Sequence, residues 1–321
     1  MSEIINLFEI YIDNKVGYMK PRGDNKLGYI NQHGEIVIQP KFNMGSEFSE
    51  GVAAVALNDK FGFINKNEEI VIDYRFDDAN SFKESLAGVK IKDNWGYINK
   101  NGEIIIKPQF DFIAYFSEGY SYVRNKDRKY AFINSKGEFI TDFIYDHVGS
   151  FSEGLARVKT NEGWNYIDKS GKKIFDSSFE VAFGFKEGLA PVKIDGKLGF
   201  IDKSGNLVIY NEYNIADGFS DGLANVKLNN KWGYINKKNE MIIEPKFDNA
   251  FSFKEGRAFV QINDKWGCIN KNGDMIIKPQ FDFALNFTNG LARVFISEMR
   301  IPIYIDRNGN RVWTPSNLSG K

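Results

Sequence analysis

The chain has 321 residues, and its 42 Lys and Arg residues are balanced by 42 Asp and Glu residues, so it carries no formal net charge. This balance argues against a nucleic-acid binder that relies on overall basic charge. A single cysteine, Cys268, excludes an intramolecular disulfide framework and a cysteine-rich zinc site, and two histidines leave little room for histidine-based chemistry. The unusual feature is the aromatic content of 28 Phe, 15 Tyr and 5 Trp residues.

The start of the chain does not look like a targeting segment. Its first 19 residues hold one basic residue, Lys15, and acidic and amide residues interrupt every apolar stretch. They therefore lack the charged and hydrophobic regions of a signal peptide. Because no run of about 18 apolar residues occurs anywhere, we expect no membrane-spanning segment and a cytoplasmic location.

A repeat of 34 residues, once 35, runs from Leu27 to about Ile301. A fixed period of this length is typical of solenoid and propeller architectures. The repeats begin at Leu27, Phe61, Trp95, Tyr130, Trp164, Leu198, Trp232 and Trp266. We predict an N-terminal half repeat or cap (1–26), eight full repeats, and a C-terminal half repeat with a tail (302–321). The full repeats cover 27–60, 61–94, 95–129, 130–163, 164–197, 198–231, 232–265 and 266–301.

Three strands are predicted in each repeat. In the third repeat a first strand at 95–99 is followed by a hairpin turn that ends at Gly102, and a second strand at 103–107 stops at Pro108. The second strand is apolar at three successive positions, so we expect it to be covered on both faces. After a connection, a third strand, as at 155–159, alternates between fixed Ala and Val positions and a variable position. We interpret the fixed side chains as inward and the variable ones as outward.

The uniform columns of the repeat explain most of the aromatic content. One column is always Phe, and we expect it to be core: Phe48, Phe82, Phe116, Phe151, Phe185, Phe219, Phe253 and Phe287. A single repeat cannot bury enough apolar surface to fold alone, so neighbouring repeats must cover one another's faces.

These elements predict an all-β fold, a tandem array of three-stranded antiparallel units. An open, elongated solenoid or superhelix is favoured because the first half repeat has Asn14 at the uniform Phe position and Pro21 at a uniform Val position. Polar and irregular terminal units are typical of open arrays. The alternative is a closed, propeller-like ring, because the two end fragments are complementary halves of a repeat.

The repeat has a recognisable pattern, W-G-Y-I-N-K-x-G-E-I-I-I-x-P-x-F-D-x-A-x-x-F-S-E-G-L-A-x-V, nearly complete at 95–123 and 266–294. It resembles the WG-repeat family of bacterial proteins over essentially the whole chain. The resemblance implies non-catalytic β modules, with no general biochemical role and no catalytic or binding residues to carry over. Leu27 and Leu198 in the Trp column, and Ala131 and Asn165 in the Gly column, depart from the pattern.

No catalytic, cofactor-binding or metal-binding residue is predicted, and we expect that the chain is not an enzyme. His33 falls in a hairpin turn, His147 is interpreted as a filler in a connection, and Cys268 replaces Tyr or Phe as a small buried side chain. Carboxylates recur before a Gly, as at Glu118, and after an aromatic residue, as at Asp111. Because they have the same neighbours in every repeat, we interpret them as turn residues rather than as an acid–base pair.

The predicted function is a binding or scaffold protein that presents an extended surface to another protein. The candidate contact residues are the variable or outward side chains Tyr120, Tyr122, Arg157, Phe259, Arg293 and Phe295. The alternative is a module that binds glycans or the cell envelope through repeated aromatic rings. Nucleic acid is disfavoured, because the basic row Lys90, Arg124, Lys159, Lys193 and Lys227 has balancing acidic residues nearby.

Overall fold

The structure is a computed structural model that describes residues 8–12, 26–296 and 302–314. These residues form β-strands, turns and connections, and none of them is helical. The prediction of an all-β tandem array of small antiparallel sheets is therefore confirmed. Within the described ranges no helix exists that could cross a membrane. Asn14 and Pro21, on which the open array was argued, lie outside the described residues.

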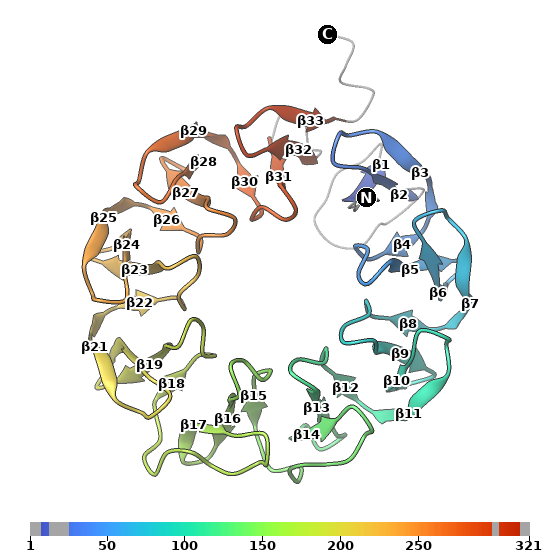
Figure 1. Ribbon diagram of the computed structural model, residues 1–321, viewed down its shortest axis with the longest axis horizontal. Coiled ribbons are helices and arrows are strands. Elements are labelled where there is room, and N and C mark those ends of the chain that lie inside the picture. The colour runs from blue at the N-terminus through green and yellow to red at the C-terminus, as the bar shows by residue number, and fades with distance from the viewer. Residues whose placement is uncertain (1–7, 13–25, 297–301, 315–321) are drawn as a thin grey trace, which may run out of the picture. The chain divides into compact units, whose positions relative to one another are not determined.

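Two compact units divide the chain, residues 1–31 with 35–178 and residues 32–34 with 179–321. The strands of the first unit are β1 (Phe8–Ile12), β2 (Lys26–Ile30), β3 (Ile36–Phe42), β4 (Met44–Gly45), β5 (Val52–Leu57), β6 (Lys60–Asn65), β7 (Ile70–Phe76), β8 (Asp78–Ala79), β9 (Ala87–Ile91), β10 (Asn94–Ile98), β11 (Ile104–Phe110), β12 (Phe112–Ile113), β13 (Tyr120–Arg124), β14 (Tyr130–Asn134), β15 (His147–Val148), β16 (Ala156–Thr160) and β17 (Gly163–Ile167). Those of the second unit are β18 (Val181–Ala182), β19 (Ala190–Ile194), β20 (Lys197–Ile201), β21 (Leu207–Tyr213), β22 (Ile215–Ala216), β23 (Ala224–Leu228), β24 (Lys231–Ile235), β25 (Met241–Phe247), β26 (Asn249–Ala250), β27 (Ala258–Ile262), β28 (Lys265–Ile269), β29 (Met275–Phe281), β30 (Phe283–Ala284), β31 (Leu291–Phe295), β32 (Pro302–Asp306) and β33 (Arg311–Trp313). Figure 1 shows the strands grouped into successive small sheets.

Most sheets contain four antiparallel strands in chain order, as in β8-β9-β10-β11. A two-residue strand forms one edge, two strands of five or six residues follow, and a strand of seven residues, or three in β33, here called the edge strand, forms the other edge. The two-residue strand lies in the segment predicted as a connection. It was not predicted because two residues carry no periodic signal. Sheets β1–β3, β12–β14 and β15–β17 have three strands among the described residues.

Each sheet is shared between two successive sequence repeats. The third strand of one repeat pairs with the first strand of the next, so that Ala87 lies opposite Ile98 and Val89 lies opposite Gly96. The first and second strands of a repeat then pair through the predicted hairpin, as Tyr97 with Ile106. The sheets are thus staggered by about half a repeat relative to the sequence period.

The Gly of the Trp-Gly pair lets the edge strand approach closely. A Cβ atom on Gly96 would lie 2.4 Å from the Ile106 carbonyl oxygen and 2.6 Å from the Pro108 nitrogen, where the pairing of β10 with β11 is bulged. Two repeats that lack this Gly, at Ala131 and Asn165, belong to sheets without a regular edge strand. The Asn165 side-chain amide instead donates hydrogen bonds to the carbonyl oxygens of Phe175 (2.8 Å) and Ser177 (3.0 Å).

The core lies between successive sheets within each unit. Tyr97 of β10 meets Phe116 of the following sheet edge to face at 4.8 Å, and its hydroxyl donates a 2.6 Å hydrogen bond to the Ala114 carbonyl. The same ring contact joins Tyr29 to Phe48, Phe63 to Phe82, Phe132 to Phe151, Phe200 to Phe219 and Tyr234 to Phe253. Within each unit the uniform Phe column therefore packs successive sheets together, as its uniformity predicts.

The second strand of each repeat is not covered on both faces. In β11, Ile104 is 49% exposed and Ile105 is 42% exposed, while Ile106 is 4% exposed. The prediction was wrong because this strand is the edge strand, which pairs on one side only and is bulged, so two of its three successive aliphatic side chains face solvent.

The interpretation of variable positions as outward was also wrong for most repeats. Ala54, Pro191, Asn225 and Phe259 occupy the variable position of the third strand, and all four are buried. Side chains at this position face the following sheet, as Phe259 does towards Phe287 and Asn225 towards Ala250. Variation at this position reflects what the adjacent sheet presents to it rather than exposure to solvent.

Candidate interaction surface

The six residues predicted as a binding surface do not form one surface. Phe259 is fully buried, and its ring stacks on that of Phe287 with the centroids 5.3 Å apart. It packs two sheets together and is not accessible to a partner. Arg293 is half-buried, and its Nε has no hydrogen-bond partner among the described residues. Phe295 packs on Phe283 at 5.9 Å.

The three predicted residues of the first unit share one neighbourhood. Tyr120 and Tyr122, both half-buried on β13, pack against the cluster that contains Phe132 and Phe151. Arg157 of β16 lies over the ring of Trp164, with Cζ 5.0 Å from the centroid. Burial lowers the pKa of the Arg157 guanidinium, although nearby tyrosine hydroxyls act in the opposite direction.

A first row of solvent-reaching side chains crosses the end of sheet β12–β14. Phe112, Arg124 and Tyr130 lie side by side in the strand register. The Arg124 guanidinium carbon is 5.6 Å from the Phe112 centroid and 5.9 Å from the Tyr130 centroid, and an ion pair of 2.5 Å joins Arg124 to Asp111. Phe112 is 38% exposed, so the row presents an aromatic face beside a compensated cation.

The next sheet, β15–β17, repeats this arrangement with other side chains. His147, Lys159 and Trp164 lie side by side in its register. The exposed His147 ring stacks on Trp164 at 6.3 Å, and the Lys159 ammonium lies 5.9 Å from the Trp164 centroid. We define the aromatic–cation surface as Phe112, Arg124, Tyr130, His147, Lys159 and Trp164.

Sequence reasoning did not include Phe112, His147 and Trp164 among the candidate contact residues, although it expected His147 to be an exposed or half-buried filler. Phe112 and His147 sit in the two-residue strands, a column that was treated as a connection, and Trp164 belongs to the anchor column that was treated wholly as core. A signal did exist in the sequence. His147 and Trp164 lie in the two repeats that lose the Gly after the anchor aromatic and the Pro of the edge strand, whereas Phe112 lies in a repeat that keeps both.

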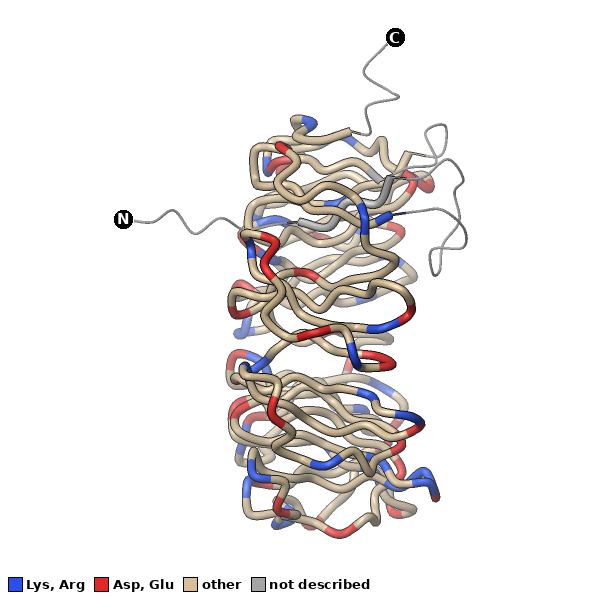
Figure 2. Tube along the Cα trace, turned by 90° about the vertical axis from the view of Figure 1, so that its right-hand side faces the viewer, with Lys and Arg blue, Asp and Glu red and all other residues tan. Residues whose placement is uncertain are grey.

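The predicted basic row exists; one of its members, Arg124, is paired with a carboxylate, and further ion pairs formed by other cations lie nearby. Lys90, Lys193 and Lys227 take the same register position as Arg124 and Lys159, beside the anchor column. Carboxylates at the start of several sheets pair with cations: Asp77 with Lys60, Asp111 with Arg124, Asp146 with Lys129, Asp248 with Lys231 and Asp282 with Lys265. Figure 2 shows acidic and basic segments interleaved along the trace, as the neutral net charge leads one to expect.

The recurring Glu of the Ser-Glu-Gly turns links each turn to the next. One oxygen of Glu118 accepts a hydrogen bond from the Glu153 N–H (2.5 Å), and the other accepts one from the Gly154 N–H (2.9 Å). Lys169 forms an ion pair with the same carboxylate at 3.2 Å. We call this series the carboxylate ladder. Its acceptors include Glu50, Glu84, Glu118, Glu187, Asp221 and Glu255.

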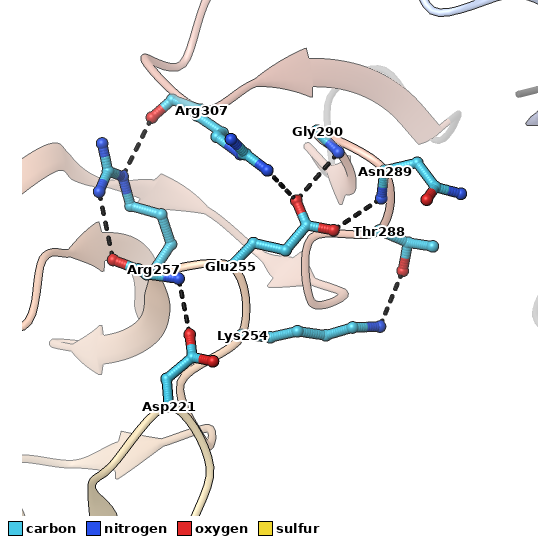
Figure 3. Close-up of polar contacts among 9 residues, drawn as sticks. Asp221, Lys254, Glu255, Arg257, Thr288, Asn289, Gly290 and Arg307 are labelled. Atoms are coloured by element: carbon cyan, nitrogen blue, oxygen red, sulfur yellow. Dashed lines mark hydrogen bonds and ion pairs between the residues drawn. The ribbon is translucent and has the colours of Figure 1, made fainter. Parts of the chain in front are cut away.

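Figure 3 shows the ladder in the second unit. The Glu255 carboxylate accepts hydrogen bonds from the N–H groups of Asn289 (2.7 Å) and Gly290 (3.0 Å) and from Arg307 (2.6 Å), while Asp221 accepts one from Gly256 (2.7 Å). Partial burial raises the pKa of Glu255, but Arg307 and the two N–H groups outweigh that effect and hold it below the usual value. These contacts account for the recurring carboxylates as structural groups.

The described residues offer little else for chemistry. Among them no group of three His, Cys, Asp or Glu side chains is placed to hold a metal ion. Cys268 is buried between sheets, and burial raises the pKa of its thiol to about 12, which keeps it protonated and unreactive near neutral pH.

Comparison with known protein families identifies the repeats of this chain. The family model described as a WG containing repeat matches residues 28–61, 61–95, 95–130, 130–164, 166–197, 199–232, 232–266 and 266–297. A comparison with curated protein sequences finds no match.

Similar solved structures are found at low sequence identity, and the first of the following shares the fold. A crystal structure of the eukaryotic initiation factor is 9% identical and aligns over 96% of this chain and 95% of its own, with a TM-score of 0.63. BamB from Moraxella catarrhalis is 9% identical over 80% of this chain and 97% of its own, with a TM-score of 0.46. The C-terminal WD40 domain of Sif2 is 9% identical over 77% and 90%, with a TM-score of 0.42.

Proposed function

Because the chain belongs to the family of WG containing repeat proteins, we propose that it is a non-catalytic scaffold that binds another protein. The observation that carries this proposal is the aromatic–cation surface. This surface lies on sheets β12–β14 and β15–β17. These two sheets lack the regular edge strand, and the glycine of the Trp-Gly pair is replaced in them. Repeat proteins bind their partners through extended surfaces.

The composition of the surface supports a protein partner. Aromatic rings and arginine are enriched at protein–protein interfaces, because they bury large apolar areas and still offer hydrogen bonds. The cations next to Phe112 and Trp164 are partly compensated by Asp111 and Asp146, so the surface does not favour a polyanion. Most of the repeated aromatic columns are buried between sheets, which leaves few rings at repeat spacing for stacking on sugars.

The carboxylates support a non-catalytic role. A hydrolase that uses two carboxylates needs them in different environments. Glu118, Glu187 and Glu255 instead share one environment, with backbone N–H donors from the next turn and one cation each. This arrangement suits the joining of adjacent sheets.

The experiment is capture of partners from lysate, followed by direct titration of each purified candidate against wild type and a Phe112→Ser/His147→Ser variant. We expect the variant to lose at least about tenfold in affinity, because both exposed rings are removed. Tyr210→Ser is the matched control, since Tyr210 is 73% exposed on β21 and lies outside the surface. Unchanged affinity of the double variant contradicts the proposal, and glycan-array binding without any protein partner replaces it with the glycan alternative.

A further inference from the structure

A row of three side chains lies at the same end of most sheets. It contains one residue of the two-residue strand, its register partner on the following strand, and the anchor residue of the next repeat. Among the described sheets, a cation stands between two aromatic rings only in the rows of Phe112, Arg124 and Tyr130 and of His147, Lys159 and Trp164. The other rows are Met44–Ala56–Phe61, Asp78–Lys90–Trp95, Val181–Lys193–Leu198, Ile215–Lys227–Trp232, Asn249–Gln261–Trp266 and Phe283–Phe295–Pro302.

An ion pair joins the two rows of the aromatic–cation surface. Lys129 directly precedes Tyr130 of the first row, and Asp146 directly precedes His147 of the second row. The Lys129 ammonium and the Asp146 carboxylate are 2.5 Å apart. The ends of sheets β12–β14 and β15–β17 therefore lie next to each other, and a partner that covers one row contacts the other.

The two cations of this surface differ in how their charges are compensated. The Arg124 guanidinium donates hydrogen bonds to one oxygen of Asp111, at 2.9 Å from Nε and at 2.5 Å from a terminal nitrogen. The Lys159 ammonium lies 5.9 Å from the Trp164 centroid and forms no ion pair with a residue that the structure describes. The nearby Asp146 is bonded to Lys129 and attracts Lys159 only at longer range. Lys159 is thus the cation of the surface that lacks a carboxylate in contact.

Two neighbouring rows of the second unit show that the rings do not need a cation in order to pack. The ion pair of Lys265 with Asp282, at 2.6 Å, joins these rows as Lys129 and Asp146 join the rows of the first unit. Their middle positions hold Gln261 and Phe295. The Trp266 ring is nevertheless buried among aromatic neighbours. The cations of the aromatic–cation surface are therefore not required for the packing of a sheet end.

The distribution of charge favours a partner group with a single negative charge. A carboxylate next to Lys159 would form a charge-assisted hydrogen bond beside the Trp164 ring. A polyanion such as nucleic acid needs several uncompensated cations along one path, whereas Arg124 and Lys129 are already paired. Phe112 is 38% exposed and His147 is also exposed, so the same two rows offer area for an apolar side chain.

We propose that the aromatic–cation surface binds a segment of its partner protein in which an Asp or Glu side chain neighbours an aromatic or aliphatic one. The partner's carboxylate pairs with the Lys159 ammonium, and its apolar side chain packs on the rings of Phe112 and His147. This inference rests on the proposed function and adds the chemistry by which the partner is recognised.

The test follows indole N–H signals by NMR in the full chain labelled with ¹⁵N-tryptophan, which contains 5 Trp residues. Trp164→Phe assigns the Trp164 signal. The probes are acetyl-Phe-Glu-Phe-amide and its uncharged counterpart acetyl-Phe-Gln-Phe-amide. We expect a saturable Trp164 shift with a Kd of about 0.1–1 mM for the Glu probe and a Kd at least about fivefold higher for the Gln probe.

Trp232 is the matched control within the same chain. The Lys227 ammonium lies 5.9 Å from the Trp232 centroid, as Lys159 lies from Trp164, but the row of Trp232 begins with Ile215 instead of an aromatic ring. The Trp232 signal should therefore need at least about tenfold more of the Glu probe to move. Lys159→Gln should remove the preference for the Glu probe over the Gln probe, whereas Lys227→Gln should leave it unchanged.

Several outcomes overturn the inference: no Trp164 shift at about 10 mM Glu probe, equal affinity of the two probes, or a preference for the Glu probe that persists in Lys159→Gln. A Trp164 shift that oligothymidylate causes at a lower concentration than the Glu probe assigns the surface to nucleic acid instead. The proposed function fails separately, when a captured partner binds the Phe112→Ser/His147→Ser variant as tightly as wild type. A partner that this double variant weakens but Lys159→Gln does not overturns only the role of the carboxylate.

Discussion

The side chain of Ile113 fills the space that a Cβ atom on Gly88 would occupy, with Cδ1 2.5 Å from that position. The two residues face each other across the interface between sheets β8–β11 and β12–β14. In the preceding interface the equivalent residues are Ala54 and Ala79, which lie in one core cluster. The large Ile113 is thus matched by the small Gly88, where the preceding interface has two residues of intermediate size.

This match predicts a strong coupling between the two positions. Gly88→Ala alone should destabilise the protein by about 1–3 kcal/mol through overpacking, and Ile113→Ala alone by about 2–4 kcal/mol through a cavity. The double variant recreates an Ala–Ala pair, so urea unfolding should show a loss at least about 1 kcal/mol smaller than the sum of the single losses. Gly184→Ala is the control, because no atom lies within 4 Å of its Cβ position, and it should cause no loss. Strict additivity would contradict the coupling.

The glycine of the Trp-Gly pair should be required only where the edge strand is present. Gly96→Ala forces a methyl group against the backbone of Ile106 and Pro108, so we expect a loss of about 2–3 kcal/mol and faster hydrogen exchange in β11. Ala131→Gly, in a sheet that lacks the regular edge strand, should cost less than about 1 kcal/mol. Equal losses from the two variants would show that the close approach of the edge strand is not the reason for this glycine.

The uniform Phe column should carry a large share of the stability. Phe151 is buried and packs on Phe132 at 5.3 Å and on Tyr120 at 5.1 Å. Phe151→Ala should therefore cost about 3–5 kcal/mol in chemical denaturation. Phe139→Ala removes a half-exposed ring and should cost less than about 1 kcal/mol. A loss below about 1 kcal/mol at Phe151 would place the core elsewhere.

The carboxylate ladder should make stability depend on pH in the acid range. Partial burial raises the pKa of Glu118, but the Gly154 N–H, Lys169 and the Glu153 N–H together lower it below the ordinary value of 4.5. Since the folded-state pKa is the lower one, the stabilisation is fully present above about pH 4.5 and is lost as the pH falls through the folded-state value.

Glu118→Gln tests this dependence. It should cost about 1 kcal/mol at pH 7, and the difference from wild type should shrink towards zero near pH 3. Glu162→Gln is the control, because that side chain is 69% exposed and pairs weakly with Lys173 at 3.4 Å. Denaturant unfolding at several pH values measures both variants. A difference that stays constant between pH 7 and pH 3 would contradict the ladder's charge dependence.

The sequence was sufficient to predict the core positions that recur in every repeat. It was not sufficient to predict burial that depends on the side chains of an adjacent sheet. Uniform positions such as Phe116 and Val123 were correctly predicted as core, because every sheet places them against the sheet before it. Phe259 was misplaced because its variability was taken for exposure, whereas it reflects packing against Phe287 of the next sheet. Ile104 was misplaced because an apolar run does not reveal that its strand lies at the edge of a sheet.

The candidate surface was predicted only in part for a related reason. The region of Tyr122 and Arg157 was identified, but Phe112 and His147 belong to strands of two residues, which leave no periodic pattern in a sequence. Their roles depend on the register that sets Phe112 beside Arg124 and His147 beside Lys159. Such lateral neighbours are distant in sequence and are created by the pairing of strands.

The stagger between sheets and sequence repeats bears on how such a chain changes length during evolution. Recombination that removes or adds one period can break the gene at any codon within the repeat, because the strands on either side of the join are those of equivalent sheets. The number of sheets can then change while every sheet stays complete. The change in repeat number is limited by the steric match of side chains on adjacent sheets. Residues such as Gly88 and Ile113 fill the same space and must therefore be inherited together.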